Sequence, residues 1–257
     1  MAANLGAGHR LAAALVEFSY TAWPTLPCPF CYQESLAPEN VQHLSTQDSI
    51  NHSDSPDWEP DWEFGYFHGT LRCGYSKCRE IVVVSGEMRH GLSEEWDDPN
   101  DGRSWTYWYR LRYSIPSIPL TDRLPDGCPE SVVLRIREAG RIFWADPAGS
   151  ANRLRSALEE LLNVRRVRRI ETTSTGKRRR LSLHRRIQIL GIGNPEVAEL
   201  IEAVKWIGNE GSHSSEIDAS NVLLASVILE HALFVMYDRS TAEIAKQARA
   251  VNRRRRV

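Results

Sequence analysis

The chain of 257 residues has no long apolar run, only five cysteines and almost no net charge. No uninterrupted apolar stretch approaches the roughly 18 residues of a membrane-spanning helix. The short apolar segment at 11–16 is followed by Glu17, which favours a small packed helix over a secretion signal. We therefore expect a cytoplasmic protein with no membrane partner. In that reducing compartment, cysteines are more often metal ligands than disulfides.

Charge is spread unevenly, although the net charge is −1. Residues 34–101 hold 15 Asp and Glu against 4 Lys and Arg, whereas residues 164–186 hold 10 Lys and Arg against one acid. A second basic block, 253–256, lies near the end of the chain. Such asymmetry favours a nucleic acid or another charged partner, and the alternative is two solvated faces. The candidate phosphate contacts are Arg165, Arg166, Arg168, Arg169, Arg178, Arg179, Arg180 and Arg185.

The N-terminal part, residues 1–115, is predicted to be β-rich. Strands are expected at 62–71, 79–84 and 104–114, where β-formers cluster. Residues 34–61 are polar and lack apolar periodicity, which predicts a loop insertion. Seven of the eight tryptophans lie before residue 150. We expect them to pack the core, and a stacking platform for bases is the alternative.

The C-terminal part is predicted to be helical. Residues 116–128 are rich in proline and form the expected linker. From 129 to 240 the apolar residues follow a period near 3.6, which predicts a bundle of about five helices. Ser182 is an expected N-cap, and Asn194-Pro195-Glu196 is a strong helix start. A polar helix and the basic tail occupy 241–257. The predicted fold class is therefore α+β.

Four cysteines form the sharpest local pattern. Cys28 and Cys31 are separated by two residues, and Cys73 and Cys78 by four. Two tight turns of this kind can direct four thiolates at one ion, in the tetrahedron that zinc prefers. The second pair lies between two predicted strands, which is typical of a zinc ribbon. We therefore predict a structural zinc. Gly74 is expected to let the second turn direct its N–H groups at sulfur. Cys128 lacks a partner and is predicted to be a bystander.

The segment KWIGNEGSH at 205–213 follows an amphipathic pattern and contains two glycines. Each glycine lowers helix propensity by about 1 kcal/mol relative to alanine. Small residues at this point permit close approach of a neighbouring helix or a ligand. Asn209 and His213 share a face if the helix continues that far. The alternative is that Gly208 ends the helix and the rest is a connecting loop.

Several helical segments together resemble a bacterial family, domain-of-unknown-function family 4145. They are SANRLRSALEELLN at 150–163, LSLHRRIQIL at 181–190, PEVAELIEAVKWIGNEGSH at 195–213 and LEHALFVMYD at 229–238. The resemblance covers roughly residues 129–238. The family belongs to the HEPN group of nucleotide-binding helical domains. The resemblance implies a HEPN-like bundle preceded by a zinc ribbon, often a homodimer, in systems that defend bacteria against foreign nucleic acid.

Active HEPN members are metal-independent ribonucleases that use an Arg, a polar residue and a His. Matched residue by residue, Asn209 takes the polar position and His213 the histidine position. Gly208 stands where the Arg is expected, so the nearest upstream cation is Lys205. Lysine lacks the bidentate fork of arginine.

Three functions remain open at this stage. The first is a HEPN-like module that binds RNA, DNA or a nucleotide, with a restriction or defence-system protein as a possible partner. The second is a ribonuclease in which His213 is the general acid or base, Asn209 orients and Lys205 contacts phosphate. The third is a non-catalytic dimeric adaptor in which Gly208 serves packing alone.

Overall fold

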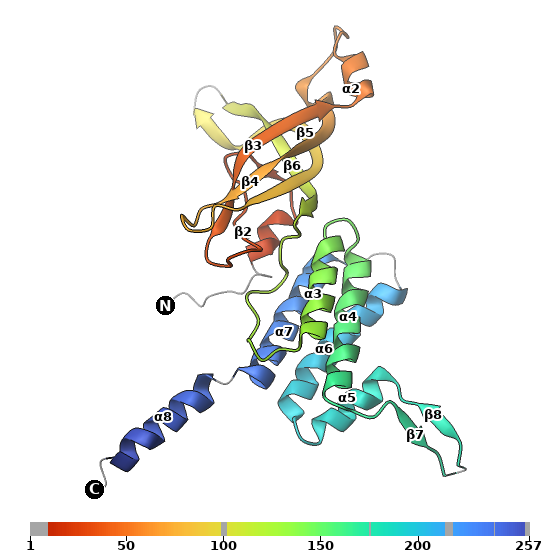
Figure 1. The fold of residues 1–257 in the computed structure, drawn as a ribbon. Helices are drawn as coiled ribbons and strands as arrows, with labels where there is room; N and C mark the ends of the chain where they lie inside the picture. Colours follow the sequence, from red (N-terminus) through yellow and green to blue (C-terminus); the bar gives the residue numbers. More distant parts are fainter. Residues whose placement is uncertain (1–9, 99–101, 175, 214–217, 239, 255–257) are drawn as a thin grey trace.

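The computed structural model describes residues 10–98, 102–174, 176–213, 218–238 and 240–254. For residues 94–98, 102–103, 210–213, 240–242, 245 and 254 it describes the backbone only. The N-terminal part forms a curled antiparallel sheet, and a group of helices follows it (Figure 1). The predicted mixture of sheet and helix is thus confirmed. His213 is the last residue of a helix, and its side chain lies outside the described residues.

Six antiparallel strands form the sheet, in the order β1-β6-β5-β4-β3-β2. The strands are β1 (Phe18–Ser19), β2 (Leu26–Pro27), β3 (Ser35–Ser45), β4 (Phe64–Cys73), β5 (Ile81–Asp98) and β6 (Gly102–Ile115). Three short helical turns accompany them: η1 (Ala12–Ala14), α2 (Gln47–His52) and η2 (Pro60–Trp62).

Alternation of apolar side chains explains the sheet. In β4 the side chains of Phe67 and Leu71 are buried, while those of Tyr66 and His68 are exposed. This two-residue period places one face of the strand against the core. The predicted strands at 62–71, 79–84 and 104–114 correspond to β4, β5 and β6.

The prediction that 34–61 is a loop insertion is wrong for most of that segment. Residues Ser35–Ser45 form the eleven-residue strand β3, and Gln47–His52 form α2. In β3 only Leu36 is buried, because most of the strand lies near the edge of the sheet with its side chains in solvent. A strand that buries one residue carries almost no apolar periodicity, so the pattern could not show it.

Helices account for most of the C-terminal part. They are α3 (Glu130–Ile142), α4 (Pro147–Val164), α5 (Leu183–Gly191), α6 (Pro195–His213), α7 (Ala219–Tyr237) and α8 (Ser240–Arg254). Helix α4 lies against α3, α6 and α7, and α8 projects away from the others (Figure 1). Ser182 caps α5, since its side chain accepts a hydrogen bond from the N–H of Arg185.

The region 129–240 is not helical throughout. The arginine-rich connection between α4 and α5 contains a small hairpin, β7 (Ile170–Thr172) paired with β8 (Arg178–Arg180). Glu171 lies opposite Arg179, and Arg179 Nη2 is 2.6 Å from Glu171 Oε1. The expectation of an all-α region is therefore corrected by these two strands.

Residues 116–128 form a packed segment with no regular secondary structure over most of its length. Ile118 and Leu120 are buried. The Leu120 carbonyl accepts a hydrogen bond from Ser226 Oγ in α7, and the N–H of Asp122 donates to Glu230 Oε2 in the same helix. The expected linker thus follows the surface of the bundle. Its buried residues join a contiguous apolar cluster that includes side chains of both the sheet and the helices.

Gly208 lies inside α6 and does not end it. The helix continues to His213, so the interpretation of 209–213 as a loop is wrong. Gly208 is buried against α4, where an added Cβ would lie 3.0 Å from Arg155 Cβ and 3.3 Å from the Ala151 carbonyl oxygen. The absence of a side chain therefore allows α6 to approach α4 closely.

Helix α7 has the length and mean hydropathy, 1.7, to cross a membrane, and 44% of that window is buried. The sequence predicts no membrane span here, because Glu230 and His231 interrupt the apolar residues of this helix. The buried side chains of α7 include Val222, Leu229 and Leu233, and α7 packs on α6 and α4. Its place in the bundle accounts for its composition without a membrane.

Substitution of Gly208 tests the close approach of α6 to α4. We expect Gly208→Leu to lower the free energy of unfolding by about 1–3 kcal/mol, because the side chain would overpack the contact with Arg155. Gly193→Leu is the matched control, since an added Cβ there meets nothing within 4 Å. Its effect should stay within about 0.5 kcal/mol. Urea denaturation measures both, and equal losses would contradict the proposed contact.

Candidate metal centre and basic groove

Two turns at one end of the sheet carry the four cysteines. Cys28 and Cys31 lie in the turn between β2 and β3, and Cys73 and Cys78 lie at the turn between β4 and β5. Strands β3 and β4 pair antiparallel with Leu36 opposite Cys73. This register brings the two turns together, although 41 residues separate the pairs in sequence.

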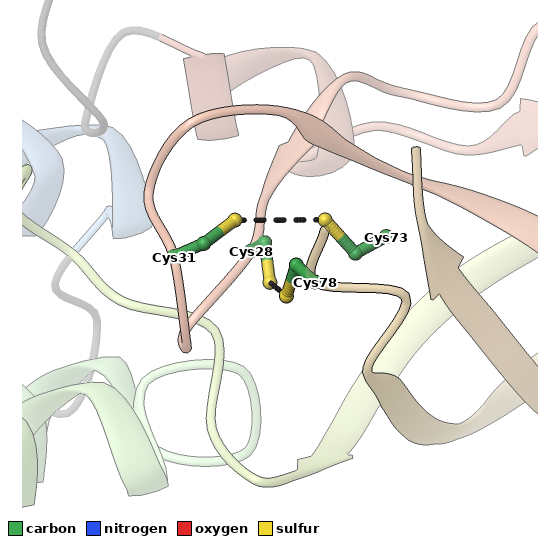
Figure 2. Close-up of side chains that lie close together, drawn as sticks. All are labelled: Cys28, Cys31, Cys73 and Cys78. Carbon is green, nitrogen blue, oxygen red and sulfur yellow. Dashed lines mark hydrogen bonds between the residues drawn. The ribbon is translucent and has the colours of Figure 1, made fainter. Parts of the chain in front are cut away.

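The sulfur atoms have the spacing of a tetrahedral ligand set. All four lie within 4.8 Å of one another. Cys28 Sγ is 3.9 Å from Cys78 Sγ, and Cys31 Sγ is 3.6 Å from Cys73 Sγ (Figure 2). A metal–sulfur bond of about 2.3 Å places the sulfurs of a regular tetrahedron about 3.8 Å apart. A disulfide would need about 2.05 Å, and all four are free thiols. The set is therefore compatible with a metal site.

Backbone N–H groups converge on the sulfurs. Cys28 Sγ receives hydrogen bonds from the N–H groups of Phe30 and Cys31, and Cys73 Sγ from that of Tyr75. Such donors stabilise thiolate. The residue after the second cysteine of each turn, Tyr32 and Arg79, has a left-handed φ of 57° and 55°. The two turns thus end in the same backbone conformation.

Gly74 lies in the second turn, whose Tyr75 N–H is directed at the Cys73 sulfur. The N–H of Gly74 donates to the Ser35 carbonyl oxygen at 3.0 Å and so ties the two turns together. An added Cβ at Gly74 would lie 3.0 Å from Glu34 Cγ. Gly74 therefore serves the contact between the turns, and Tyr75 supplies the N–H that reaches Cys73.

The four cysteine thiols do not share one pKa, because their surroundings differ. Burial raises the pKa of Cys28, and it raises the pKa of Cys73 to about 12. At Cys31 burial acts to raise the pKa, but hydrogen bonds from the N–H of Gln33 and with the neighbouring sulfurs have the larger combined effect. The pKa of Cys31 is therefore lowered to about 7. Four thiolates this close repel one another, so full ionisation requires a cation among them.

Cys128 lies apart from these four, as expected. Burial raises the pKa of its thiol to about 11. It lines a cavity of about 1020 Å³ between the Cys28–Cys31 turn, residues 113–128 and α3. The charged lining of this cavity has both signs, including Asp122, Asp126 and Arg137. This balance indicates no particular class of ligand.

Lys205 is the residue expected to contact phosphate, and it is buried, with 3% of its side chain exposed. Lys205 Nζ lies 3.4 Å from Glu202 Oε1 and 3.3 Å from His184 Nδ1. It also lies 3.4 Å from the centroid of the Trp206 ring, a cation–π contact. The ammonium group of Lys205 is therefore already in contact with side chains of the protein.

Asn209 lies one helical turn after Lys205 on α6, and His213 one turn further. Four-residue spacing places all three along one side of the helix. Asn209 is half-buried. Sequence reasoning missed His184 as a member of this cluster, although His184 Nδ1 lies 2.8 Å from Glu202 Oε1. No signal in the sequence joins α5 to α6 at this residue.

The predicted arginines fall into three groups. Arg165, Arg166, Arg168 and Arg185 line an open groove of about 810 Å³ at the junction of α4 and α5. Arg169 donates to Asn163 Oδ1 at 2.8 Å and is held at the edge of this junction. The remaining three, Arg178, Arg179 and Arg180, are exposed on the hairpin.

Arg186 has a different role from its neighbours. It is buried, and its Nη2 donates to Asn163 Oδ1 at 2.9 Å and to the Val167 carbonyl oxygen at 3.1 Å. Burial lowers the pKa of its guanidinium, which the neighbouring charges of Arg169 and Arg180 reinforce. Arg186 thus fixes the turn that carries the groove arginines.

A second polar cluster lies on the sheet, at the end opposite the cysteines. His43 Nε2 is 2.6 Å from Tyr109 Oη, and the rings of His90 and Tyr107 stack at 4.5 Å. Tyr107 Oη donates to Glu63 Oε2 at 3.4 Å. Burial lowers the pKa of His43 and raises that of Tyr109 to about 12. These contacts link β3, β5 and β6 into one network.

Comparison with known proteins gives two matches, each over less than half of the chain. Residues 16–113, which span the sheet, match a domain of unknown function (DUF8608). Residues 137–254, from α3 to α8, match a domain of unknown function (DUF4145). The second match confirms the resemblance to family 4145. Searches of curated proteins and of solved structures each gave no match. Neither matching description states an activity.

Proposed function

We propose that this protein binds nucleic acid through the groove at the junction of α4 and α5 and holds a structural zinc at the four cysteines. The groove carries the proposal. Four arginines line it, and no carboxylate is among its described lining residues. The polar groups beside them are the neutral amides of Gln188 and Asn194. Uncompensated guanidinium groups that converge on one concavity are suited to phosphate oxygens.

The hairpin extends this positive surface. Arg178 and Arg180 are exposed on β8, and Glu171 pairs with Arg179 between them. A phosphate backbone in the groove could continue along these side chains. Backbone contacts of this kind give affinity that is independent of sequence and falls with salt.

Zinc is the ion that best fits the cysteine set. Zinc prefers four thiolates in a tetrahedron, and the described sulfurs are spaced for one. Four protein ligands leave no open coordination position, so the proposed zinc has a structural role. It would tie the β2–β3 turn to the β4–β5 turn. The resemblance to the HEPN group further supports a HEPN-like homodimer in bacterial defence against foreign nucleic acid, with a defence-system protein as a partner.

A second candidate function is a metal-independent ribonuclease. Helix α6 runs unbroken from Lys205 through Asn209 to His213, which favours a common site for these residues. A histidine there would take the proton of an attacking 2′-hydroxyl as the 2′-oxygen bonds to phosphorus. The bond between phosphorus and the 5′-oxygen breaks, and the leaving 5′-oxygen takes a proton from a general acid, a protonated imidazole or water. His184 Nδ1 lies 2.8 Å from Glu202 Oε1 and 3.3 Å from Lys205 Nζ, so His184 adds a second imidazole to this region.

Metal analysis tests the structural zinc. We expect one zinc per chain in the purified protein, measured by atomic emission after dialysis. Cys73→Ser should lose the zinc and lower the melting temperature, because metal binding contributes to folding free energy. Cys128→Ser, which removes a thiol outside the cluster, should keep the zinc. Zinc retained by Cys73→Ser would contradict the four-cysteine site.

Salt-dependent binding tests the groove. We expect Arg168→Ala to weaken binding of any nucleic acid and to reduce the slope of log affinity against log salt by about 0.7–0.9, because one phosphate contact is lost. Arg110→Ala is the control, since Arg110 is an exposed arginine on β6. Fluorescence anisotropy at several salt concentrations measures both. Equal slopes for the two variants would exclude the groove as the binding surface.

Product analysis tests the ribonuclease. Labelled single-stranded RNA, incubated without added divalent metal, should yield 2′,3′-cyclic phosphate and 5′-hydroxyl ends. His213→Ala should lower the cleavage rate by about 10²–10⁴, the contribution of a general acid or base. His231→Ala, at an exposed position on α7, is the control. Cleavage that survives in His213→Ala would show that His213 is not the catalyst.

A further inference from the structure

Trp206 is the last tryptophan of the sequence, on α6, and it is 57% exposed. A single exposed apolar side chain is ordinary in a folded protein, so the exposure of Trp206 alone does not mark a contact surface. The side chains around the indole decide whether it is one. One face of the ring covers Lys205 Nζ, at 3.4 Å from the ring centroid. Lys205 is buried and paired with Glu202, so the ring face over Lys205 Nζ packs on the protein. The rest of the indole is exposed to solvent.

A chain of contacts joins this indole to the arginine groove. The rings of His184 and Trp206 lie 6.5 Å apart between centroids. His184 Nε2 is 3.0 Å from Gln188 Nε2, and Gln188 Oε1 accepts a hydrogen bond from Arg185 Nη1 at 2.9 Å. Gln188 and Arg185 both line the groove. Side-chain contacts through His184 and Gln188 thus connect Trp206 on α6 to two residues of the groove on α5.

The charge around the indole is already balanced within the protein. Glu202, one turn before Trp206, contacts both Lys205 Nζ at 3.4 Å and His184 Nδ1 at 2.8 Å. The indole thus offers a neutral stacking face, while the groove offers four cations. These two chemistries match the two parts of a nucleotide, an aromatic base and an anionic phosphate.

We propose that the surface formed by Trp206 and the groove of Arg165, Arg166, Arg168 and Arg185 binds single-stranded nucleic acid, with an unpaired base stacked on Trp206. This rests on the proposed nucleic-acid binding and specifies its ligand. Phosphate contacts alone accept a duplex as readily as a single strand. A free indole adds affinity only for a base that is not enclosed in a duplex.

Fluorescence anisotropy with the full chain tests this assignment. The probes are labelled U15 and dT15, which distinguish RNA from DNA, and a 15-base-pair duplex. Trp206→Ala should weaken binding of the single strands by about 5- to 150-fold, the equivalent of about 1–3 kcal/mol for one stacked base. Binding of the duplex should be unchanged. The salt slope should also be unchanged, because no phosphate contact is removed.

Two further variants keep the result interpretable. Trp206→Phe retains an aromatic face and should recover most of the single-strand affinity. Trp62→Ala removes another exposed tryptophan, 44% exposed on η2, and should leave all affinities unchanged. Equal melting temperatures of Trp206→Ala and Trp62→Ala would exclude misfolding as the cause of any loss.

The outcomes separate the two proposals. If Trp206→Ala binds U15 and dT15 as tightly as the unchanged protein while Arg168→Ala binds them weakly, the stacking role is wrong and the groove stands. If Trp206→Ala weakens duplex and single strand equally, the preference for single strands is wrong. If the unchanged protein binds none of the three probes at low salt, nucleic-acid binding itself is wrong.

Discussion

The close approach of α6 to α4 at Gly208 is the constraint on which the helical part depends. A protein interior is packed to crystal density, so one missing side chain sets the distance between two helices. Helix α4 leads into the turn that bears Arg165 and Arg168, and α6 bears Lys205 and Trp206. The separation of α4 and α6 thus fixes the separation of the groove from the indole, with α5 packed beside them.

The sheet is organised from its cysteine end. The β3–β4 register aligns Leu36 with Cys73 and so sets the distance between the two turns. The N–H of Gly74 and the carbonyl of Ser35 reinforce that alignment. A bound ion would add its free energy to contacts that are already formed by the backbone. The thiol cluster therefore follows from strand pairing and does not require a separate metal-binding fold.

Sequence alone predicted what local chemistry encodes. Cysteine spacing identified the four thiols, and capping residues such as Ser182 identified helix starts. It could not predict β3, because a strand that buries only Leu36 has no periodic signal. It assigned Lys205 to a phosphate contact and could not predict its contact with His184, because His184 lies on another helix. The grouping of the predicted arginines into a groove, Arg169 at its edge and a hairpin likewise depends on tertiary packing.

The β3–β4 hairpin has two ends with opposite tolerance to change. At the cysteine end, losing one residue would turn every following side chain of β3 to the other face. At the far end lies α2, followed by exposed residues such as Ser53 and Asp54 (Figure 1). The number of residues is therefore constrained at the cysteine end of the hairpin and unconstrained in the exposed segment after α2. A fluorophore or an inserted peptide after α2 would therefore report on the molecule while leaving the thiols, the groove and the indole undisturbed.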